Sequence, residues 1–330
     1  MAPKISPDDL NLLYDGGNES VVDIVFVHGL RGHPRKTWEA QDPENPDELV
    51  FWPQDLLPET IKNSRIFSFG YATQFVTFYG INTEPINHTS IDHHSASLIL
   101  KFGNVRRDTQ TPTRPIIFVA HSLGGLVVAN SLVGKYGTDA QGQEVINHTY
   151  GTVFFGTPFK SSDKAPVAEI ARKVLKMFGD TNDQTIRDLD KRSEKLQKIS
   201  NDFHSLLEER LSSNDLKPIQ VACFFEEIKT TRTFFKVFEK DLGHIVTADS
   251  ATLAGCKQFG INATHQMMCR FSNVENAGYK LVTGKIKEMI SNFNKSKAQL
   301  KVSYIWTYSR NIQYLAAHIT SGRRKDSDHR

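Results

Sequence analysis

Residues 117–126 have the sequence IFVAHSLGGL, and this stretch decides how the rest of the chain is interpreted. Its first four residues are apolar and partly β-branched, which is typical of a buried strand. After His121 and Ser122 follows an apolar segment of helical length, LGGLVVANSLV (residues 123–133). The sequence therefore predicts a strand that turns sharply into a helix, with Ser122 on the turn.

Ser122 has the surroundings of a catalytic serine. A serine nucleophile on a strand-to-helix turn needs small residues two positions before it and two positions after it, because larger side chains would collide across the turn. Ala120 and Gly124 occupy these positions, with alanine where glycine is the commoner residue. A purely structural turn is the alternative, but the strand before Ser122 and the helix after it favour a nucleophile.

A serine nucleophile needs a general base, and a carboxylate must hold that base. In the expected chain order, the acid and then the histidine follow the serine. His265 lies in INATHQMMCRF (residues 261–271), a loop after the last expected strand and before the last expected helix. A base there can reach the carboxyl edge of a parallel sheet, so His265 is the predicted base. The other histidines after His121 are His148, His204, His244 and His318, with His329 in the tail.

The acid is expected to follow the strand predicted at IQVACFF (residues 219–225), which leads into Glu226 and Glu227. Successive strand residues point to opposite faces, so only one of these two glutamates can face the histidine. We favour Glu226. Glu227 and Asp249, which follows an expected sixth strand at residues 244–247, are the alternatives.

Acyl transfer also needs N–H donors for the oxyanion of the tetrahedral intermediate. Leu123, directly after the nucleophile, supplies one backbone N–H, and the second is expected from a loop after an early strand. His28 and Gly29 follow such a strand at residues 21–27, so the N–H of Leu30 is the second predicted donor. His28 is expected to orient this loop and not to act as the base. A simple turn is again the alternative.

Strand and helix patterns alternate along the chain. Strands are expected at residues 21–27, 65–71, 115–120, 152–155, 219–225 and 244–247, and helices at 51–62, 91–105, 123–135 and 279–293. This alternation predicts an α/β fold with a mostly parallel central sheet and helices on both of its faces.

Residues 159–216 are charged and have a helical pattern, with apolar residues three, four or seven apart at Leu189, Leu196, Ile199, Phe203 and Leu206. We interpret them as a helical insertion packed on the domain. A lid over a binding cleft and a partner helix of a coiled coil are the alternatives. The domain is predicted to span residues 10–295, and residues 296–330 form a C-terminal extension whose polar, basic end is expected to be disordered.

The composition is that of an ordinary globular chain, with 39% hydrophobic and 23% charged residues. Forty basic and 37 acidic residues give a net charge of +3, which argues against nucleic acid as a partner. The three cysteines are scattered and predict neither a disulfide framework nor a zinc site, and no metal or cofactor is expected. No secretory signal and no membrane span are expected. The chain is therefore interpreted as soluble and intracellular, with peripheral membrane contact left open.

Four motifs together carry a family resemblance: FVHGLRGHPRKTW (residues 26–38), FVAHSLGGLV (118–127), FFGTPF (154–159) and NATHQMMCRF (262–271). They resemble the serine esterase family of α/β-hydrolases, in particular the serine-active-site-containing proteins and the lipase-like domains at the N-termini of fungal NOD-like receptors. The resemblance covers about residues 10–295 and implies an α/β-hydrolase fold, Ser122 as nucleophile and His265 as base. It agrees with Glu226 as the acid, because the family often has a glutamate after this aromatic strand end.

The same resemblance implies ester or lipid hydrolysis, phospholipid remodelling, and a location at endoplasmic reticulum or mitochondrial membranes. Two features depart from the family. The nucleotide-binding loop G-x-x-x-x-G-K-[ST] expected of the fungal receptors does not occur in this sequence. The aromatic stretch VSYIWTYSRNIQYL (residues 302–315) does not match the family.

The sequence thus predicts a serine hydrolase that cleaves carboxylic esters, lipid esters first among them, through a Ser-His-Glu/Asp triad and an acyl-enzyme. An acyltransferase in phospholipid remodelling would use the same residues with an alcohol in place of water. A signalling or interaction module would keep the fold without the activity. Both alternatives stay open at this point.

Overall fold

The structure is a computed structural model that describes residues 5–72, 91–134, 139–159, 167–178, 193–234, 238–251, 253 and 255–295. The chain divides into two compact units, Met1–Ile286 and Lys287–Arg330. In the second unit, residues 287–295 are helical. The predicted C-terminal extension, 296–330, lies outside the described residues, as do Leu189, His318 and His329, and the predicted domain limits stay predictions.

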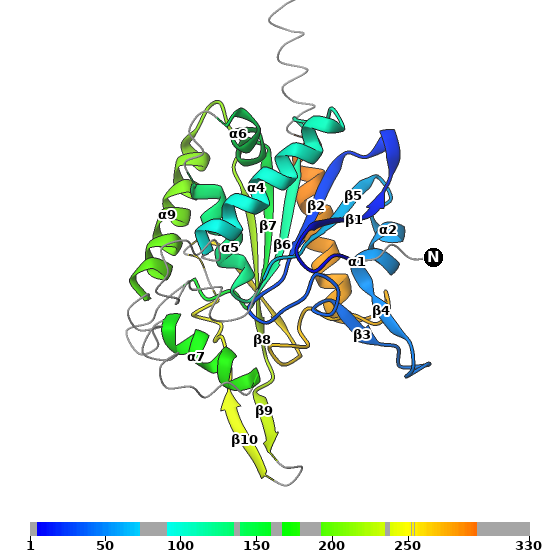
Figure 1. Ribbon diagram of the computed structural model, residues 1–330, viewed down its shortest axis with the longest axis vertical. Coiled ribbons are helices and arrows are strands. Elements are labelled where there is room, and N and C mark those ends of the chain that lie inside the picture. The colour runs from blue at the N-terminus through cyan, green and yellow to red at the C-terminus, as the bar shows by residue number, and fades with distance from the viewer. Residues whose placement is uncertain are drawn as a thin grey trace, which may run out of the picture. The chain divides into compact units, whose positions relative to one another are not determined.

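A seven-stranded sheet forms the centre of the large unit (Figure 1). Its strand order is β1 (Leu10–Asp15), β5 (Ser64–Phe69), β2 (Val22–Val27), β6 (Ile116–His121), β7 (Thr149–Phe155), β8 (Gln220–Glu226) and β11 (Lys257–Ile261). Within this sheet β1 pairs antiparallel with β5, and the remaining neighbours pair in parallel. The carboxyl ends of the parallel strands therefore meet at one edge, where such sheets place their ligands.

Helices cover both faces of the sheet (Figure 1). One face carries α4 (Ile91–Asp108), α5 (Gly124–Val133), α6 (Ala140–Asn147) and α9 (Ser193–Ser212), and the other carries the helical residues 277–286. The other elements are η1 (Gly17–Glu19), β3 (Glu39–Gln41), β4 (Leu49–Phe51), α1 (Trp52–Asp55), α2 (Leu57–Thr60), α7 (Val167–Phe178), β9 (Thr230–Phe234) and β10 (Phe238–Gly243). The predicted mostly parallel α/β architecture is confirmed.

Alternate residues of β2 build a different core on each face of the sheet. Val25 and Val27 belong to the apolar cluster that includes residues of α4, α5 and α9. Phe26 points the other way, and its ring lies 5.0 Å from the rings of both Trp38 and Trp52, edge to face in each case. Because both faces of β2 are covered, the strand is apolar without interruption from Ile24 to Val27.

The amino-terminal edge of the sheet is held by a buried ion cluster. The Asp23 carboxylate accepts hydrogen bonds from Arg65 Nε at 2.8 Å, Arg106 Nη1 at 2.6 Å and Arg114 Nη1 at 3.3 Å. The cluster joins β2 to β5, to the end of α4 and to the turn before β6. The side chains of Asp23, Arg65 and Arg106 are almost fully buried, so these charges are shielded from solvent.

Two of the expected elements are wrong in detail. Residues 244–247 form a bend and not a strand, and β11 is the strand that pairs with β8. Lys257 and Gln258 of β11 are exposed, because β11 is the edge strand of the sheet, and so the segment lacks the apolar run that marks a buried strand. The helix expected at 51–62 is two short helices, α1 and α2, since Pro58 cannot continue an α-helix across its own position.

The insertion between β7 and β8 contains two described helices. Leu196, Ile199 and Phe203 of α9 are buried in the core cluster, so this helix packs on the domain as expected. Residues of α7, Val174 and Met177, line a pocket at Ser122. The insertion thus contributes both a packed helix and a wall of a cleft.

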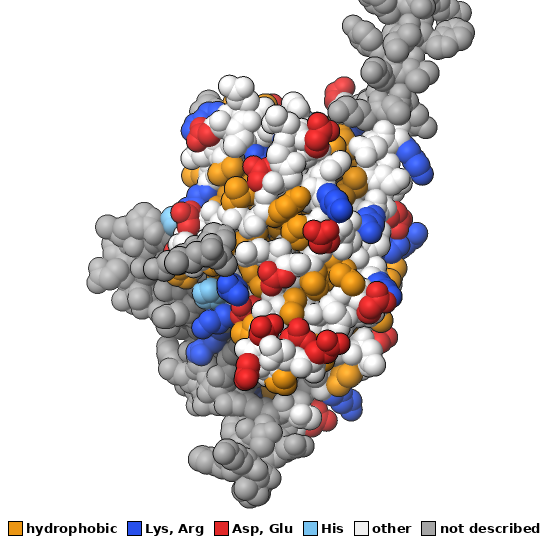
Figure 2. All heavy atoms as spheres, turned by 90° about the vertical axis from the view of Figure 1, so that its right-hand side faces the viewer, with side chains coloured by type: hydrophobic (Ala, Val, Ile, Leu, Met, Phe, Trp, Pro, Cys, Tyr) orange, Lys and Arg blue, Asp and Glu red, His pale blue; other side chains and the backbone are white. Residues whose placement is uncertain are grey.

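Charged side chains of both signs are interspersed with apolar ones on the face shown in Figure 2, in keeping with the net charge of +3. Within the described ranges, none of the helices combines the length and the apolar character that a membrane span requires.

Candidate active site

Ser122 lies on the turn between β6 and α5 with a positive φ of 55°. A non-glycine residue in this left-handed region stores about 1–3 kcal/mol of strain, which persists only where the surroundings enforce it. The turn is enforced by close packing: a Cβ on Gly124 would lie 2.2 Å from the carbonyl oxygen of His28. The N–H of Ser122 also donates to the Phe155 carbonyl at 2.7 Å.

In α/β-hydrolases, a serine on a strained turn, the nucleophile elbow, stands at the carboxyl end of a central parallel strand and directly before a helix. Ser122 has this position. The chain has the α/β-hydrolase fold. Ala120 fills the first small position of the elbow and is fully buried in the core cluster, so the methyl group is accommodated there.

Three of the predicted residues meet at this edge of the sheet. His265 Nε2 lies 3.0 Å from Ser122 Oγ, and His265 Nδ1 lies 2.6 Å from Glu226 Oε2. Ser122 follows β6, Glu226 ends β8 and His265 stands in the loop after β11. Relative exposures of 3%, 0% and 2% for Ser122, His265 and Glu226 place the whole chain of hydrogen bonds away from bulk water. In such surroundings the bonds are electrostatically stronger than in water.

Glu226 is the carboxylate that the structure brings to His265. Its second oxygen, Oε1, accepts hydrogen bonds from the backbone N–H groups of Ile245 and Val246, the latter at 3.2 Å. Glu227 points elsewhere, since its carboxylate lies against Gly260 of β11, and Asp249 is exposed. The bend at 244–247, which the sequence suggested as a strand, therefore supplies the donors that orient Glu226.

The loop after β2 packs directly against the elbow. A Cβ on Gly29 would lie 2.9 Å from Ser122 Cβ and 2.8 Å from the carbonyl oxygen of His121, so only glycine fits. Leu30 lines the pocket beside Ser122. Among the described residues no acceptor is found for the N–H of Leu30 or of Leu123, the N-cap residue of α5. The oxyanion hole that the sequence predicts from these two N–H groups stays a prediction.

His28 supports this loop from behind. Its Nδ1 donates to the Gly29 carbonyl at 3.1 Å, and its ring stacks on Tyr71 at a centroid distance of 4.4 Å. Burial lowers the pKa of His28 to about 3, so the ring is uncharged at neutral pH. These contacts agree with an orienting part for His28 and separate it from His265.

His121 is a site residue to which the sequence analysis assigned no part. Its ring lines the pocket at Ser122, and its Nε2 lies 2.9 Å from the backbone carbonyl oxygen of His265. The two residues are 144 positions apart. The one available signal was its place directly before the serine.

The pocket at Ser122 has a volume of about 120 Å³. Leu30, Val174 and Met177 form an apolar part of its lining, and Arg31, Lys36 and Arg270 form a basic part. Among the described residues that line it there is no aspartate or glutamate. The opening thus combines an apolar wall with a positive one.

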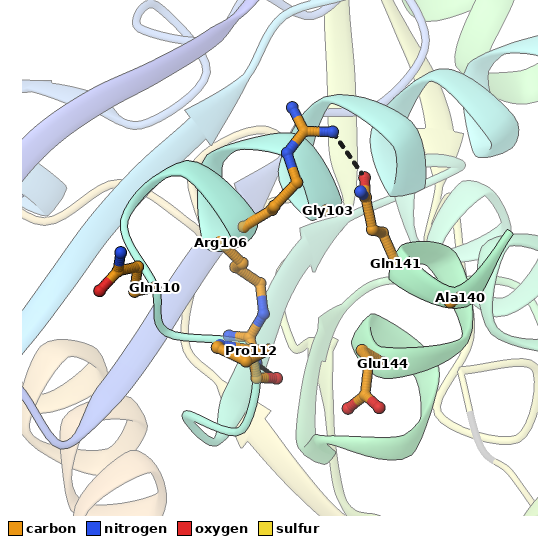
Figure 3. Close-up of a pocket in the computed structure, with 8 residues that line it drawn as sticks. Gly103, Arg106, Gln110, Pro112, Ala140, Gln141 and Glu144 are labelled. Atoms are coloured by element: carbon orange, nitrogen blue, oxygen red, sulfur yellow. Dashed lines mark hydrogen bonds between the residues drawn. The ribbon is translucent and has the colours of Figure 1, made fainter.

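A larger pocket, of about 430 Å³, lies between α4, α6 and the turn after α4 (Figure 3). It is lined by Gly103, Arg106, Arg107, Gln110, Pro112, Ala140, Gln141 and Glu144. Arg106 belongs to the ion cluster at the amino-terminal edge, so this pocket is at the edge of the sheet away from Ser122. None of the described residues that line it is a serine, a cysteine or a histidine.

No protein-family model matches the sequence. The chain is 27% identical to Protein SERAC1 of Homo sapiens over 259 residues, 75% of this chain and 36% of that protein. For Protein SERAC1 of Danio rerio the values are 26% over 268 residues, 78% and 37%. The chain thus spans little more than a third of the length of these relatives.

Solved structures with a similar fold include the lipase BlEst2 of Bacillus licheniformis, at 14% identity and a TM-score of 0.47, covering 86% of this chain and 99% of that one. Another is olei00960, a hydrolase from Oleispira antarctica, at 12% identity and a TM-score of 0.42, covering 87% and 95%. The similarity to Protein SERAC1 agrees with the family resemblance drawn from the motifs.

Proposed function

We propose that this chain is a serine hydrolase that cleaves carboxylic esters, with Ser122 as nucleophile, His265 as general base and Glu226 as the acid of the triad. One observation supports the proposal above all others. It is the continuous, buried line of hydrogen bonds from Ser122 Oγ through both ring nitrogens of His265 to Glu226. A serine on a strained turn, a base in contact with it and an acid behind the base are the parts that acyl transfer needs.

The hydrogen bonds of His265 support one arrangement of protons before the reaction. The Glu226 carboxylate accepts from Nδ1–H of His265, which leaves the Nε2 lone pair free to accept the Ser122 hydroxyl proton. As Oγ attacks the ester carbonyl, that proton moves to Nε2, and the ionised Glu226 stabilises the resulting imidazolium. The N–H groups of Leu30 and Leu123 bind the oxyanion, at about 3–4 kcal/mol for each donor.

Collapse of the tetrahedral intermediate expels the alcohol, which takes the proton from His265 Nε2 and leaves the acyl group on Ser122. A water molecule then gives its proton to Nε2 and attacks the acyl-enzyme. The second intermediate releases the carboxylic acid, and Ser122 regains its proton from His265. An acyltransferase would differ only in using an alcohol for the second attack.

The pocket lining suggests the substrate class. We assign the acyl part of the ester to the apolar wall of Val174 and Met177, and a negatively charged group on the alcohol part to the basic wall. Arg31, Lys36 and Arg270 would attract such a group, and the described residues of the lining include no carboxylate that would oppose it. Lipid esters with an anionic head group combine both features.

The decisive experiment is labelling by a fluorophosphonate probe, which forms a covalent bond to an activated serine. We expect the wild-type chain to be labelled, Ser122→Ala to be unlabelled, and a control, Ser213→Ala in the turn after α9, to be labelled like wild type. A folded wild-type chain that takes no label would show that the fold is present without the activity. Adding glycerol to a p-nitrophenyl ester assay separates the alternatives, since an acyltransferase forms the glyceryl ester in preference to the free acid.

The substrate assignment has its own test. Esters of one acyl chain with neutral or anionic alcohols are compared in wild type, Lys36→Gln and Arg270→Gln. We expect each variant to raise KM for the anionic ester by about 3- to 10-fold more than for the neutral one, as for the loss of one exposed charge contact. Equal changes for both esters would contradict the assignment.

A further inference from the structure

His121 links the strand that carries Ser122 to the loop that carries His265. It is the last residue of β6, directly before the elbow, and its side chain is buried at 8% relative exposure. Its Nε2 lies 2.9 Å from the His265 carbonyl oxygen, and the two imidazole rings are 4.9 Å apart at an interplanar angle of 41°. The contact therefore joins the backbone of His265 to the residue directly before Ser122.

The direction of this hydrogen bond follows from the chemistry of its acceptor. A carbonyl oxygen can only accept, so the proton of His121 is on Nε2. Burial and the neighbouring His265 lower the pKa of His121 well below its usual range, so the ring stays uncharged and donates at all ordinary pH values. An uncharged neighbour also adds no repulsion when His265 itself becomes an imidazolium.

The other contacts of the His265 loop act elsewhere along it. The indole N–H of Trp52 donates to the Cys269 carbonyl at 2.9 Å, four residues beyond His265. Met267 and Met268 donate from their backbone N–H groups to Thr264, which holds the turn together internally. In the described part of the chain, the hydrogen bond from His121 is the one that joins β6 to the backbone of His265 itself.

These bonds form a closed ring of contacts. Ser122 Oγ meets His265 Nε2, the His265 carbonyl meets His121 Nε2, and His121 is covalently joined to Ser122. Within such a ring the distance between nucleophile and base depends on the His121 bond, because loss of that bond lets the loop backbone shift relative to β6. A misplacement of about 1 Å at a reacting centre can lower a rate by about 100-fold.

We propose that His121 is a positioning residue of the reaction, which sets the separation of Ser122 Oγ and His265 Nε2 by holding the backbone of His265 to the end of β6. The proposal rests on the proposed hydrolase function. His121 touches neither the hydroxyl proton nor the ester carbon in this account. It acts through His265.

Two substitutions at position 121 separate a positioning part from mere packing. His121→Gln keeps an N–H donor at about the reach of Nε2, and His121→Leu fills similar space without a donor. The control is His148→Leu. In wild type the His148 ring, at the end of α6, forms a hydrogen bond with the Glu144 carbonyl and is not part of the Ser122 pocket. We expect fluorophosphonate labelling of His121→Leu to be about 10- to 100-fold slower than wild type, as for a displaced base.

His121→Gln is expected to recover most of this rate, and the loss in His121→Leu is expected in kcat with KM for a p-nitrophenyl ester little changed. If His121 contributed only packing, the labelling rates of both variants would fall alike, together with their unfolding temperatures. Labelling of His121→Leu at the wild-type rate, or of His121→Gln as slowly as His121→Leu, would overturn the proposal.

Crystal structures of wild type and His121→Leu test the inference separately from the proposed function. A folded wild-type chain that takes no label would contradict the proposed hydrolase function. An unchanged distance between Ser122 Oγ and His265 Nε2 in His121→Leu would contradict the positioning role, whatever the labelling rate. A longer separation in the variant supports it.

Discussion

Two buried carboxylates lie at opposite edges of the central sheet, and their partners differ in kind. Asp23, at the amino-terminal edge, receives hydrogen bonds from three guanidinium groups. Glu226, at the carboxyl edge, receives them from two backbone N–H groups and one imidazole. Both side chains have a relative exposure of 0%, so the difference is not one of burial.

The partners determine what each carboxylate can do. Arginine keeps its charge at any physiological pH, so the Asp23 cluster holds its charges permanently and can only bind elements together. Histidine can gain and lose a proton near neutral pH, so the Glu226 pair can follow a charge that appears and disappears during a reaction. We therefore interpret the amino-terminal edge as structural and the carboxyl edge as catalytic.

Removing the base should give the largest effect. We expect His265→Ala to lower kcat for a p-nitrophenyl ester by about 10⁴-fold or more, because triad members act as a unit, while the free energy of unfolding changes little by comparison. Steady-state kinetics and urea unfolding on the same preparation give both values. Activity near that of wild type in a folded His265→Ala protein would remove His265 as the base.

Exchanging the acid for its amide should come next. In Glu226→Gln the oxygen must stay opposite the N–H groups of Ile245 and Val246, so the new NH₂ faces His265 Nδ1. That nitrogen must then accept, which moves the ring proton to Nε2 and blocks transfer from Ser122. A wrong tautomer of this kind lowers kcat by about 10⁴-fold in a comparable triad. A matched Glu227→Gln variant should keep wild-type kcat, and equal losses in both variants would contradict the choice of Glu226.

The sequence predicted the parts of this site that depend on local order. Ser122, with Ala120 and Gly124 around it, could be identified because strand, turn and helix are neighbours along the chain. The end of β2 and the His28-Gly29 pair directly after it could be predicted for the same reason. A local pattern is enough where residues close in sequence make the structure.

The remaining parts depend on contacts across the fold. Residues 244–247 have three β-branched side chains in succession, yet they bend around the Glu226 carboxylate instead of pairing in the sheet. The choice between Glu226 and Glu227 depends on β11, against whose Gly260 the Glu227 carboxylate lies. The partner of His121 is in a distant loop. None of these contacts has a signature within a single segment.

At the structural edge, the expected effect is on stability. We expect Asp23→Asn to lower the free energy of unfolding by about 3–5 kcal/mol, because three guanidinium groups lose their one buried counter-charge. Activity per folded molecule should stay near that of wild type, since the cluster lies at the other edge from Ser122. Urea unfolding and titration with the fluorophosphonate probe measure the two quantities. Arg114→Gln is the matched control, with a smaller loss expected because its bond is longer, at 3.3 Å, and more exposed.

A reversed result would break the comparison between the edges. If Asp23→Asn lowered the labelling rate of the folded fraction as strongly as Glu226→Gln does, the two carboxylates would not be separable into structural and catalytic ones.

The smallest expected effect is the loss of stability at acid pH, and it should come from the carboxyl edge. The pKa of buried His28 is about 3, against an ordinary value of 6.5 in the unfolded chain. Between pH 6.5 and 3 the unfolded chain therefore binds a proton that the folded chain does not. The contribution of His28 to the free energy of unfolding is therefore complete above pH 6.5. It is lost as the pH falls, by up to about 1.4 kcal/mol per pH unit.

Urea unfolding at intervals from pH 7 to pH 4 measures this slope. In His28→Asn we expect lower stability at pH 7, through loss of the stacking on Tyr71, but a shallower fall with acid than in wild type. His148→Asn, at a partly exposed histidine, should keep the wild-type slope. Equal slopes in all three proteins would show that His28 takes up its proton without unfolding. The loop that holds Leu30 would then tolerate a buried charge on His28.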